Sequence, residues 1–215
     1  GVGEVPTLNE PRWRVANAFE VRKGLGILGA SEDCSTLANC LPPNVPISNV
    51  FADPQALVVR YEGQFEFRPA RRVTVALAPL AQWANNPLLA YEQVSLGNYT
   101  IGRGLDPGIA VGDRAVGAAF ELRFGSRIAG AQGGVAIEPF AFADWAKAWI
   151  DDGGTNPDPR AVLTAGAGVR GRWRDQFDFG VTFAAPLRRA GYQTERSDPR
   201  VLFTLNARLL PWGDR

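Results

Sequence analysis

Long stretches of this chain alternate apolar and polar residues at every second position, and this period constrains the fold more than any other feature. In residues 115–124, which read AVGAAFELRF, Phe120 and Leu122 share one parity, whereas Glu121 and Arg123 share the other. Successive side chains of a β-strand point to opposite faces, so a period of two indicates half-buried strands. Sustained helical periodicity is almost absent. The sequence therefore predicts an all-β fold.

Alternation identifies eight candidate strands, at residues 12–29, 56–68, 71–84, 114–125, 134–150, 161–174, 176–188 and 200–212. Each has about ten residues or more, which is long for a soluble sheet and suits a tilted strand that crosses a bilayer. Short to moderate connectors such as PAR and RDQ alternate with mostly longer, polar ones such as DDGGTNPDP. Short turns at one rim and long loops at the other are typical of an antiparallel transmembrane β-barrel.

The tryptophans favour the same fold. They mostly fall near the ends of the candidate strands, as interfacial aromatic girdles do: Trp13, Trp83, Trp145, Trp149, Trp173 and Trp212. A soluble β-sandwich also alternates and buries tryptophans, and it stands as the alternative fold. Strand length and the charges that recur on one face favour the barrel. No internal repeat or linker is visible, so we expect one domain over residues 1–215.

Composition argues against several classes of function. The chain has no histidine, which removes Ser-His-Asp and Cys-His nucleophile pairs and the commonest catalytic metal ligands. Its 23 Lys and Arg nearly balance 22 Asp and Glu, so no nucleic-acid surface is indicated. GLGILGAS at residues 24–31 superficially resembles a phosphate-binding loop, but no Lys-Ser/Thr closes it. We expect no enzyme, no catalytic residue, no metal site and no cofactor.

Cys34 and Cys40 lie in SEDCSTLANCLPPNVP, a loop-like run rich in Ser, Asn and Pro. Five residues separate them, which allows a small closed loop but leaves too few ligands for a zinc site. A local disulfide in an oxidising compartment is the favoured interpretation. A pair of free, partly buried thiols is the alternative.

A glycine-rich segment between two candidate strands, SLGNYTIGRGLDPG, carries a family resemblance. It resembles the long surface loop, folded inward, of the BamA-like outer-membrane polypeptide transporters, and in particular of the two-partner secretion transporters (TpsB, the ShlB/FhaC haemolysin secretion group). The family loop has a Val-Arg-Gly-Tyr type motif. Here the motif reads Gly102-Arg103-Gly104-Leu105, followed by Asp106-Pro107-Gly108, so the arginine and its glycine match and the flanking valine and tyrosine do not.

Two later segments extend the resemblance over essentially the whole chain. Glu121-Leu122-Arg123 looks like the family strand that ends in Glu-Leu-Arg. Phe142-Ala143-Asp144-Trp145-Ala146 looks like the family's aromatic-x-Asp-x-Gly motif, with alanine in place of glycine. The three elements occur in family order, with five candidate strands from the loop to the C-terminus as in the family.

The resemblance implies a sixteen-stranded barrel preceded by periplasmic POTRA domains. This chain supplies about eight strands and no POTRA domain, and it does not begin with methionine, so we expect the C-terminal half of a longer transporter. A processed chain, or a half-barrel that pairs with a second polypeptide, is the alternative. A closed barrel of eight strands is physically allowed.

The function implied by the resemblance is two-partner secretion: movement of an unfolded exoprotein across the bacterial outer membrane. The implied partners are the passenger polypeptide and outer-membrane lipids, with no nucleic acid. The alternative function is structural, a small outer-membrane barrel that acts as an anchor or binds something at the cell surface through its long loops.

The resemblance also directs attention to Arg103. A charge on a loop folded into a barrel lumen needs an anionic partner, because it would otherwise be poorly solvated. Strand parity puts Glu121 and Asp144 on the lumen side of adjacent strands. We therefore predict that Arg103 points inward and pairs with Asp144, with Glu121 as a second acceptor. Gly102 and Gly104 would let the backbone pass close to the wall. In the alternative, the loop is exposed and the arginine meets only water.

Overall fold

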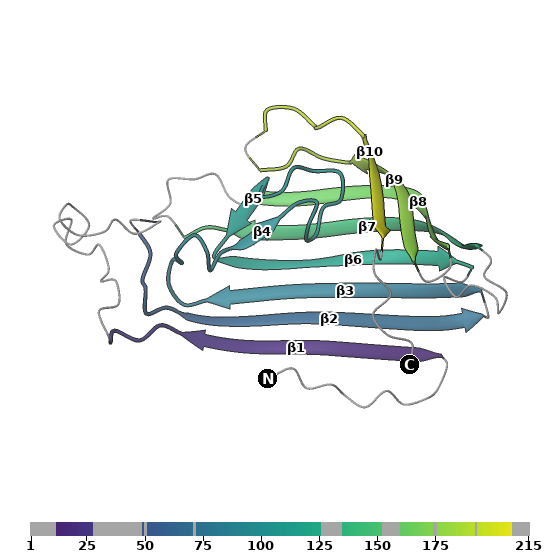
Figure 1. Cartoon of the computed structure of the whole chain (residues 1–215). Helices are drawn as coiled ribbons and strands as arrows, with labels where there is room; N and C mark the ends of the chain where they lie inside the picture. Colours follow the sequence, from purple (N-terminus) through teal and green to yellow (C-terminus); the bar gives the residue numbers. More distant parts are fainter. Residues whose placement is uncertain are drawn as a thin grey trace.

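The computed structural model describes residues 12–27, 49, 51–70, 72–125, 135–151, 160–173, 176–191 and 193–207. Within these ranges the chain forms ten β-strands and no helix, which confirms the predicted all-β fold. Eight strands form one antiparallel sheet in the order β1-β2-β3-β6-β7-β8-β9-β10 (Figure 1), and β4 pairs with β5 separately. None of the described residues belongs to a helix long and apolar enough to cross a membrane.

The strands of the large sheet are β1 (Trp13–Lys23), β2 (Leu57–Ala70), β3 (Val73–Ala84), β6 (Arg114–Phe124), β7 (Val135–Trp149), β8 (Arg160–Trp173), β9 (Phe177–Pro186) and β10 (Arg200–Ala207). Each of the eight predicted segments coincides with one of these strands, although the predicted ends differ from the observed ones.

Two of the predicted segments extend beyond their strands by more than one described residue at an end. Residues 24–27 continue the first segment but are not strand. Here the chain packs against the loop before β2, and a Cβ atom on Gly24 would lie 1.8 Å from the carbonyl oxygen of Pro54. Residues 187–188 likewise lie outside β9, which ends at Pro186. Proline has no N–H group to donate to a neighbouring strand, so it is a natural end for a strand.

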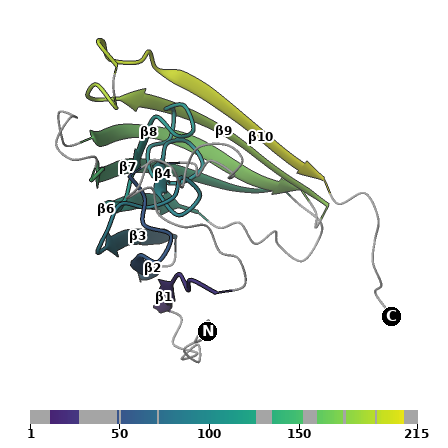
Figure 2. The ribbon, with the colours of Figure 1, turned by 90° about the vertical axis from the view of Figure 1, so that its left-hand side faces the viewer.

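The large sheet is strongly curved, so that one face is concave and the other faces outward (Figure 2). β1 and β10 are its edge strands, and among the described residues they do not pair with each other. The fold is therefore a partial, unclosed barrel-like sheet of eight strands. It is not the closed eight-stranded barrel that the sequence left open.

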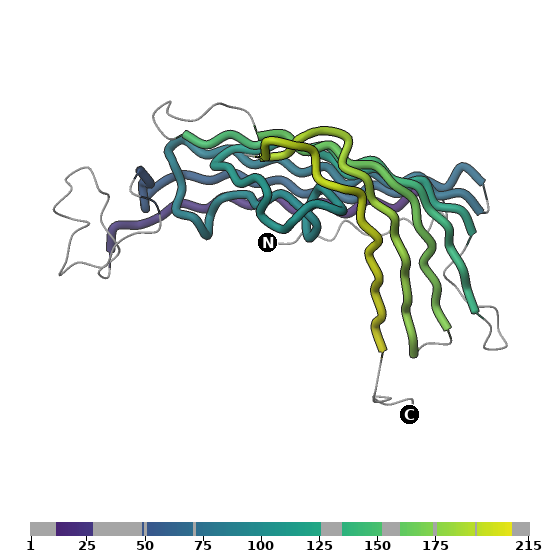
Figure 3. Tube along the Cα trace, turned by 90° about the horizontal axis from the view of Figure 1, so that it is seen from above, coloured from purple at the N-terminus to yellow at the C-terminus, as the bar shows by residue number. Residues whose placement is uncertain are grey.

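The connection between β3 and β6, residues 85–113, folds back onto the concave face (Figures 2 and 3) and is called the inserted loop. It contains the two short strands β4 (Val94–Leu96) and β5 (Ala110–Gly112), which pair antiparallel to form a stem. The sequence did not predict this stem, because strands of three residues are too short to show an alternating pattern.

The largest apolar core lies between the inserted loop and the concave face of the sheet. The loop contributes Val94, Leu96, Ile101, Leu105 and Ala110, and the sheet contributes Leu80, Ala115, Ala146, Ala148 and Val162. Leu96 and Val162 are fully buried. Burial of these side chains is a favourable contribution that exists only while the loop is folded in.

The outward face is instead rich in exposed apolar side chains. Phe183, Phe203 and Leu205 are 51%, 68% and 60% exposed. A face with many exposed large apolar side chains is typical of one that contacts lipid or another protein. A β-sandwich would cover it with a second sheet, but the one other described sheet, β4–β5, lies on the concave side.

Tryptophans lie mainly where the girdle pattern predicted. Trp13, Trp149 and Trp173 are terminal residues of β1, β7 and β8, and Trp83 is next to the end of β3. Trp145 lies within β7. Trp212 lies outside the described residues.

Candidate functional site

The inserted loop reverses direction above the sheet wall, and its glycines make the reversal feasible. Asp106, Pro107, Gly108 and Ile109 form a turn in which the Ile109 N–H donates to the Asp106 carbonyl (3.2 Å). Proline in second place and a glycine with φ of +73° in third are what a type II turn favours. Gly104 has a φ of +83°, and a Cβ there would lie 2.6 Å from the Cβ of Ala184.

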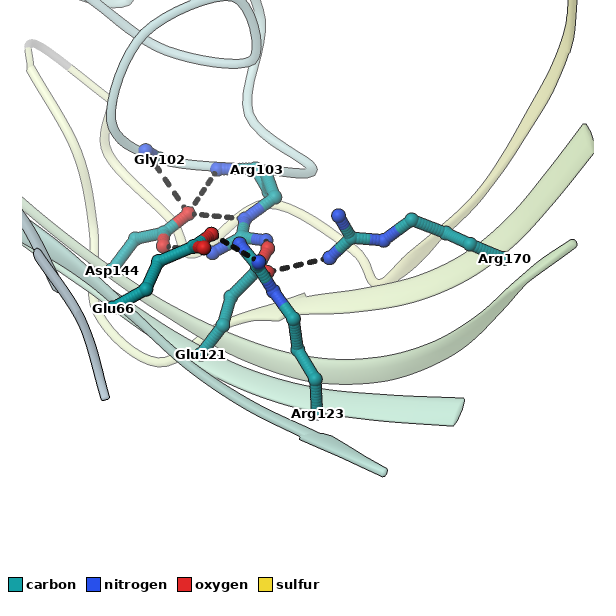
Figure 4. A network of polar contacts seen from close by, with 7 residues as sticks. All are labelled: Glu66, Gly102, Arg103, Glu121, Arg123, Asp144 and Arg170. Atoms are coloured by element: carbon teal, nitrogen blue, oxygen red, sulfur yellow. Dashed lines mark hydrogen bonds and ion pairs between the residues drawn. The ribbon is translucent and has the colours of Figure 1, made fainter. Parts of the chain in front are cut away.

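Arg103, just before this turn, binds Asp144 of β7 through both its backbone and its side chain (Figure 4). Its backbone N–H and Nε donate to Asp144 Oδ2 at 3.0 and 2.9 Å, and Nη2 donates to Oδ1 at 2.6 Å. The Gly102 N–H also donates to Oδ2, at 3.4 Å. Asp144 is 0% exposed, and every hydrogen-bond donor described for its carboxylate lies on the loop that covers it.

Glu121 of β6 is the second acceptor of the Arg103 guanidinium, through Nη1. The guanidinium carbon also lies 3.8 Å from the centre of the Phe142 ring, which adds a cation–π contact. Burial acts to lower the pKa of Arg103, but hydrogen bonds and charge from Asp144 and Glu121 outweigh it, and the pKa is raised. The arginine is charged at physiological pH, as guanidinium groups are, and these contacts hold it on the concave face.

Glu121 joins Arg103 to a wider network (Figure 4). Arg123 Nε and Arg170 Nη2 donate to Glu121 Oε2, at 2.7 and 2.6 Å. Arg123 Nη1 donates onward to Glu66 Oε1 at 2.6 Å. The network thus contains three arginines and three carboxylates, a balanced set that draws on four strands and the loop.

Sequence reasoning identified Arg103, Asp144 and Glu121 but missed the other charged members, Glu66, Arg123 and Arg170. By the same parity, Glu66 and Arg123 lie on the polar faces of their strands. Parity does not say which residues of different strands stand side by side. The register does: Glu66 is level with Ala76, Ala76 with Glu121, and Glu121 with Phe142.

The remaining predicted loop residues have different surroundings. Leu105, at the place where the family motif has tyrosine, is 1% exposed and belongs to the apolar core. Asp106 is outside the network and pairs with Arg200 at the start of β10, 2.6 Å from Oδ1 to Nη1. The hydrogen bond from Arg200 lowers the pKa of the Asp106 carboxyl.

Cys34 and Cys40 lie outside the described residues, so their disulfide stays a prediction. Mass spectrometry without reductant checks it, and two thiols that alkylate directly would contradict it. In the described part of the chain, no group of three or more His, Cys, Asp or Glu side chains is arranged to hold a metal ion.

The chemistry open to the network is electrostatic. Glu121 and Asp144 accept from guanidinium groups that do not lose a proton at physiological pH. A carboxylate saturated in this way is poorly suited to act as a general base. What the arrangement does well is hold the inserted loop against the sheet by several charge-assisted hydrogen bonds.

Comparison with known proteins agrees with this architecture. The family described as haemolysin secretion/activation protein ShlB/FhaC/HecB matches residues 10–171. The structure is similar to CdiB from Escherichia coli, with a TM-score of 0.72 and 16% identity over 92% of this chain and 34% of that one. It is also similar to CdiB from Acinetobacter baumannii, with a TM-score of 0.55 and 18% identity over 71% of this chain and 27% of that one. No curated protein sequence matches significantly. The chain spans about a third of the first solved structure.

Proposed function

Because the chain belongs to the haemolysin secretion/activation family ShlB/FhaC/HecB, we propose that it is part of a two-partner secretion transporter in the bacterial outer membrane. Its substrate is an unfolded partner exoprotein that crosses the membrane through the barrel lumen. The resemblance of the loop, of Glu121-Leu122-Arg123 and of the Asp144 segment to the family motifs supports the same assignment.

Within that transporter, the chain forms the C-terminal part of the barrel wall. β1 and β10 are edge strands of the described sheet, so their outer N–H and C=O groups are available for pairing. In a complete barrel these groups would pair with further strands, either of the same polypeptide or of a second one. The exposed apolar side chains of the outward face are suited to contact outer-membrane lipids. The concave face becomes part of the lumen wall.

The proposed work of the site is conformational and not enzymatic. The inserted loop occupies the lumen, and Arg103 holds it there through Asp144 and Glu121. Passage of a polypeptide requires the loop to leave, so these contacts set the free energy of opening. The single observation that carries this proposal is the fully buried carboxylate of Asp144, whose described hydrogen-bond donors are all on the loop.

Secretion by cells that make the full-length protein tests the proposal. Deletion of the gene is expected to remove a large protein from the culture medium, and the wild-type gene is expected to restore it. Arg103→Ala should reach the outer membrane in normal amount but restore little secretion. Arg103→Lys is the matched control: it keeps the charge but cannot reproduce the bidentate contact, so it should be intermediate.

Two results would contradict this assignment. One is an unchanged culture medium after deletion, which would favour the structural alternative, particularly if adhesion of the cells were lost instead. The other is full secretion by Arg103→Ala at wild-type protein levels, which would show that the arginine does not control opening.

A further inference from the structure

A second buried carboxylate lies at the other end of the inserted loop, where the loop joins β6. Asp113 is 1% exposed. Its Oδ1 accepts hydrogen bonds from the Leu88 N–H (2.9 Å) and from Gln93 Nε2 (2.9 Å), and its Oδ2 accepts one from the Asp151 N–H (2.8 Å). One carboxylate thus ties together both ends of the loop and the segment that follows β7.

The backbone of Asp113 adds further contacts. Its N–H donates to the Trp149 carbonyl at 2.8 Å. Its carbonyl accepts from Gln82 Nε2 at 3.3 Å, and the same Nε2 also donates to the Glu92 carbonyl at 3.0 Å. Next to it, Gly112 packs so closely on β7 that a Cβ atom would lie 2.7 Å from the Trp149 carbonyl oxygen. The β4–β5 stem is therefore fixed directly to the wall.

These contacts share no residue with those of Arg103. Two buried carboxylates of the structure thus hold different parts of the loop: Asp144 binds its tip, residues 97–109, through Arg103, and Asp113 fixes its stem. We propose that Asp113 is a positioning residue that acts as the hinge of the inserted loop. When the contacts of Arg103 with Asp144 and Glu121 break, Asp113 keeps the stem bound to the sheet. Only the tip of the loop then moves out of the lumen. This rests on the proposed function, in which the loop moves during secretion.

The mechanical reason is that the two anchors respond to different events. Whatever displaces the Arg103 guanidinium removes two of the donors of Asp144, but it leaves untouched the Asp113 carboxylate that accepts from Leu88 and Asp151. A loop hinged in this way returns to the same place after each opening. A loop whose stem also detached would have to rebind the concave face of the sheet after each opening.

Hydrogen exchange of the full-length transporter in detergent, followed by mass spectrometry, tests the independence of the anchors without requiring secretion. In Arg103→Ala, amides within residues 97–109 should exchange about tenfold faster or more, because their buried contacts are lost. The amides of Leu88 and Asp151 should keep their wild-type rates. This half of the experiment does not depend on the folding of any Asp113 variant.

Asp113→Asn should give the complementary pattern. An amide presents an NH2 group where the carboxylate presented an acceptor, so a donor then faces the N–H of Leu88 or Asp151. Exchange at the amide that faces the NH2 group should rise about tenfold or more. Asp198→Asn is the matched control: the same chemical change on an exposed aspartate between β9 and β10, outside the loop, should leave both anchors unchanged.

A cross-link adds a functional test. Ser95 of β4 and Val111 of β5 are directly paired in the stem. A disulfide between cysteines at these two positions would keep the two stem strands together. Secretion should survive oxidation of this pair, because the stem does not open. Loss of secretion on oxidation, or equal acceleration of exchange at both anchors in either single variant, overturns the hinge. Absence of secretion from the wild type would contradict the proposed function instead, and the exchange results would still decide on the hinge.

Discussion

The concave and outward faces belong to the same sheet, yet charged side chains gather on the concave face and apolar side chains on the outward face. Six charged side chains meet on the concave side: Glu66, Arg103, Glu121, Arg123, Asp144 and Arg170. On the outward side the sheet exposes large apolar groups such as Phe120, Phe183 and Phe203, and Phe120 is the immediate neighbour of Glu121 on β6. One residue along a strand separates these two environments.

The two faces are therefore stabilised by different kinds of interaction. The outward side needs no specific partner, because any apolar surroundings suit a phenylalanine ring. The concave side depends on particular pairs, since a buried guanidinium or carboxylate is costly unless its partner is present. Substitutions on the concave side should therefore show strong coupling between sites, and those on the outward side should act independently.

The largest effect is expected from breaking the pair of Arg103 and Asp144. Either Arg103→Ala or Asp144→Ala should weaken the closed position of the loop by about 3–5 kcal/mol, because the remaining charge is left buried without its partner. The double variant should be little worse than either single one. Exchange of the loop amides in a double-mutant cycle measures this coupling, and a fully additive double variant would falsify the pairing.

A smaller effect should distinguish the two faces directly. Phe183→Arg places a charge on the outward face near the membrane interior and should destabilise the folded protein by about 2–4 kcal/mol. Thr182→Arg, one residue away on the concave face, should cost much less. Urea titrations of the full-length protein in lipid vesicles give both values. Equal penalties would reject the assignment of the faces.

Next in size is the backbone of the loop tip. Gly104→Ala forces a side chain into a φ of +83° and against the Cβ of Ala184, 2.6 Å away. The expected cost is about 1–3 kcal/mol in the closed position of the loop. Gly108→Ala is the comparison, because it shares the positive φ (+73°) but would meet only Ser95 Oγ at 3.6 Å. If both variants were equally mild, close packing on the wall would not explain the glycine.

The smallest effect concerns the exposed pair of Asp106 and Arg200. Because the hydrogen bond from Arg200 lowers the pKa of Asp106, the pair contributes stability above the carboxyl's ordinary pKa. That contribution is lost as the pH falls through the lowered pKa. A carboxyl-carbon NMR titration in detergent should show the Asp106 midpoint rising toward its usual value in Arg200→Gln. An unchanged midpoint would mean that the two side chains do not interact in solution.

The strand positions were largely predictable from the sequence, because alternation is a local property. Each predicted segment coincides with an observed strand, and the errors lie at ends where proline or close packing stops the sheet, as at Pro186 and Gly24. The stem β4–β5 was missed, since three residues carry no detectable period.

For the site, parity and family resemblance together pointed to Arg103, Glu121 and Asp144. No pattern in the sequence distinguished Asp113 from the other aspartates that lie next to candidate strands. Its importance comes from Leu88 and Asp151, which lie 25 and 38 residues away along the chain.

What the sequence by itself determined is the face on which each strand side chain lies, because the direction of a side chain follows from the geometry of its own backbone. Only the tertiary structure decided which charges of different strands stand side by side. Glu66 and Glu121 share a row because two successive pairings, through Ala76, bring them level, and Arg103 reaches Glu121 because the inserted loop descends onto the concave face. The register of the strands and the position of the inserted loop both depend on contacts between segments far apart in the chain. The alternation of apolar and polar residues within one strand gives no information about such contacts.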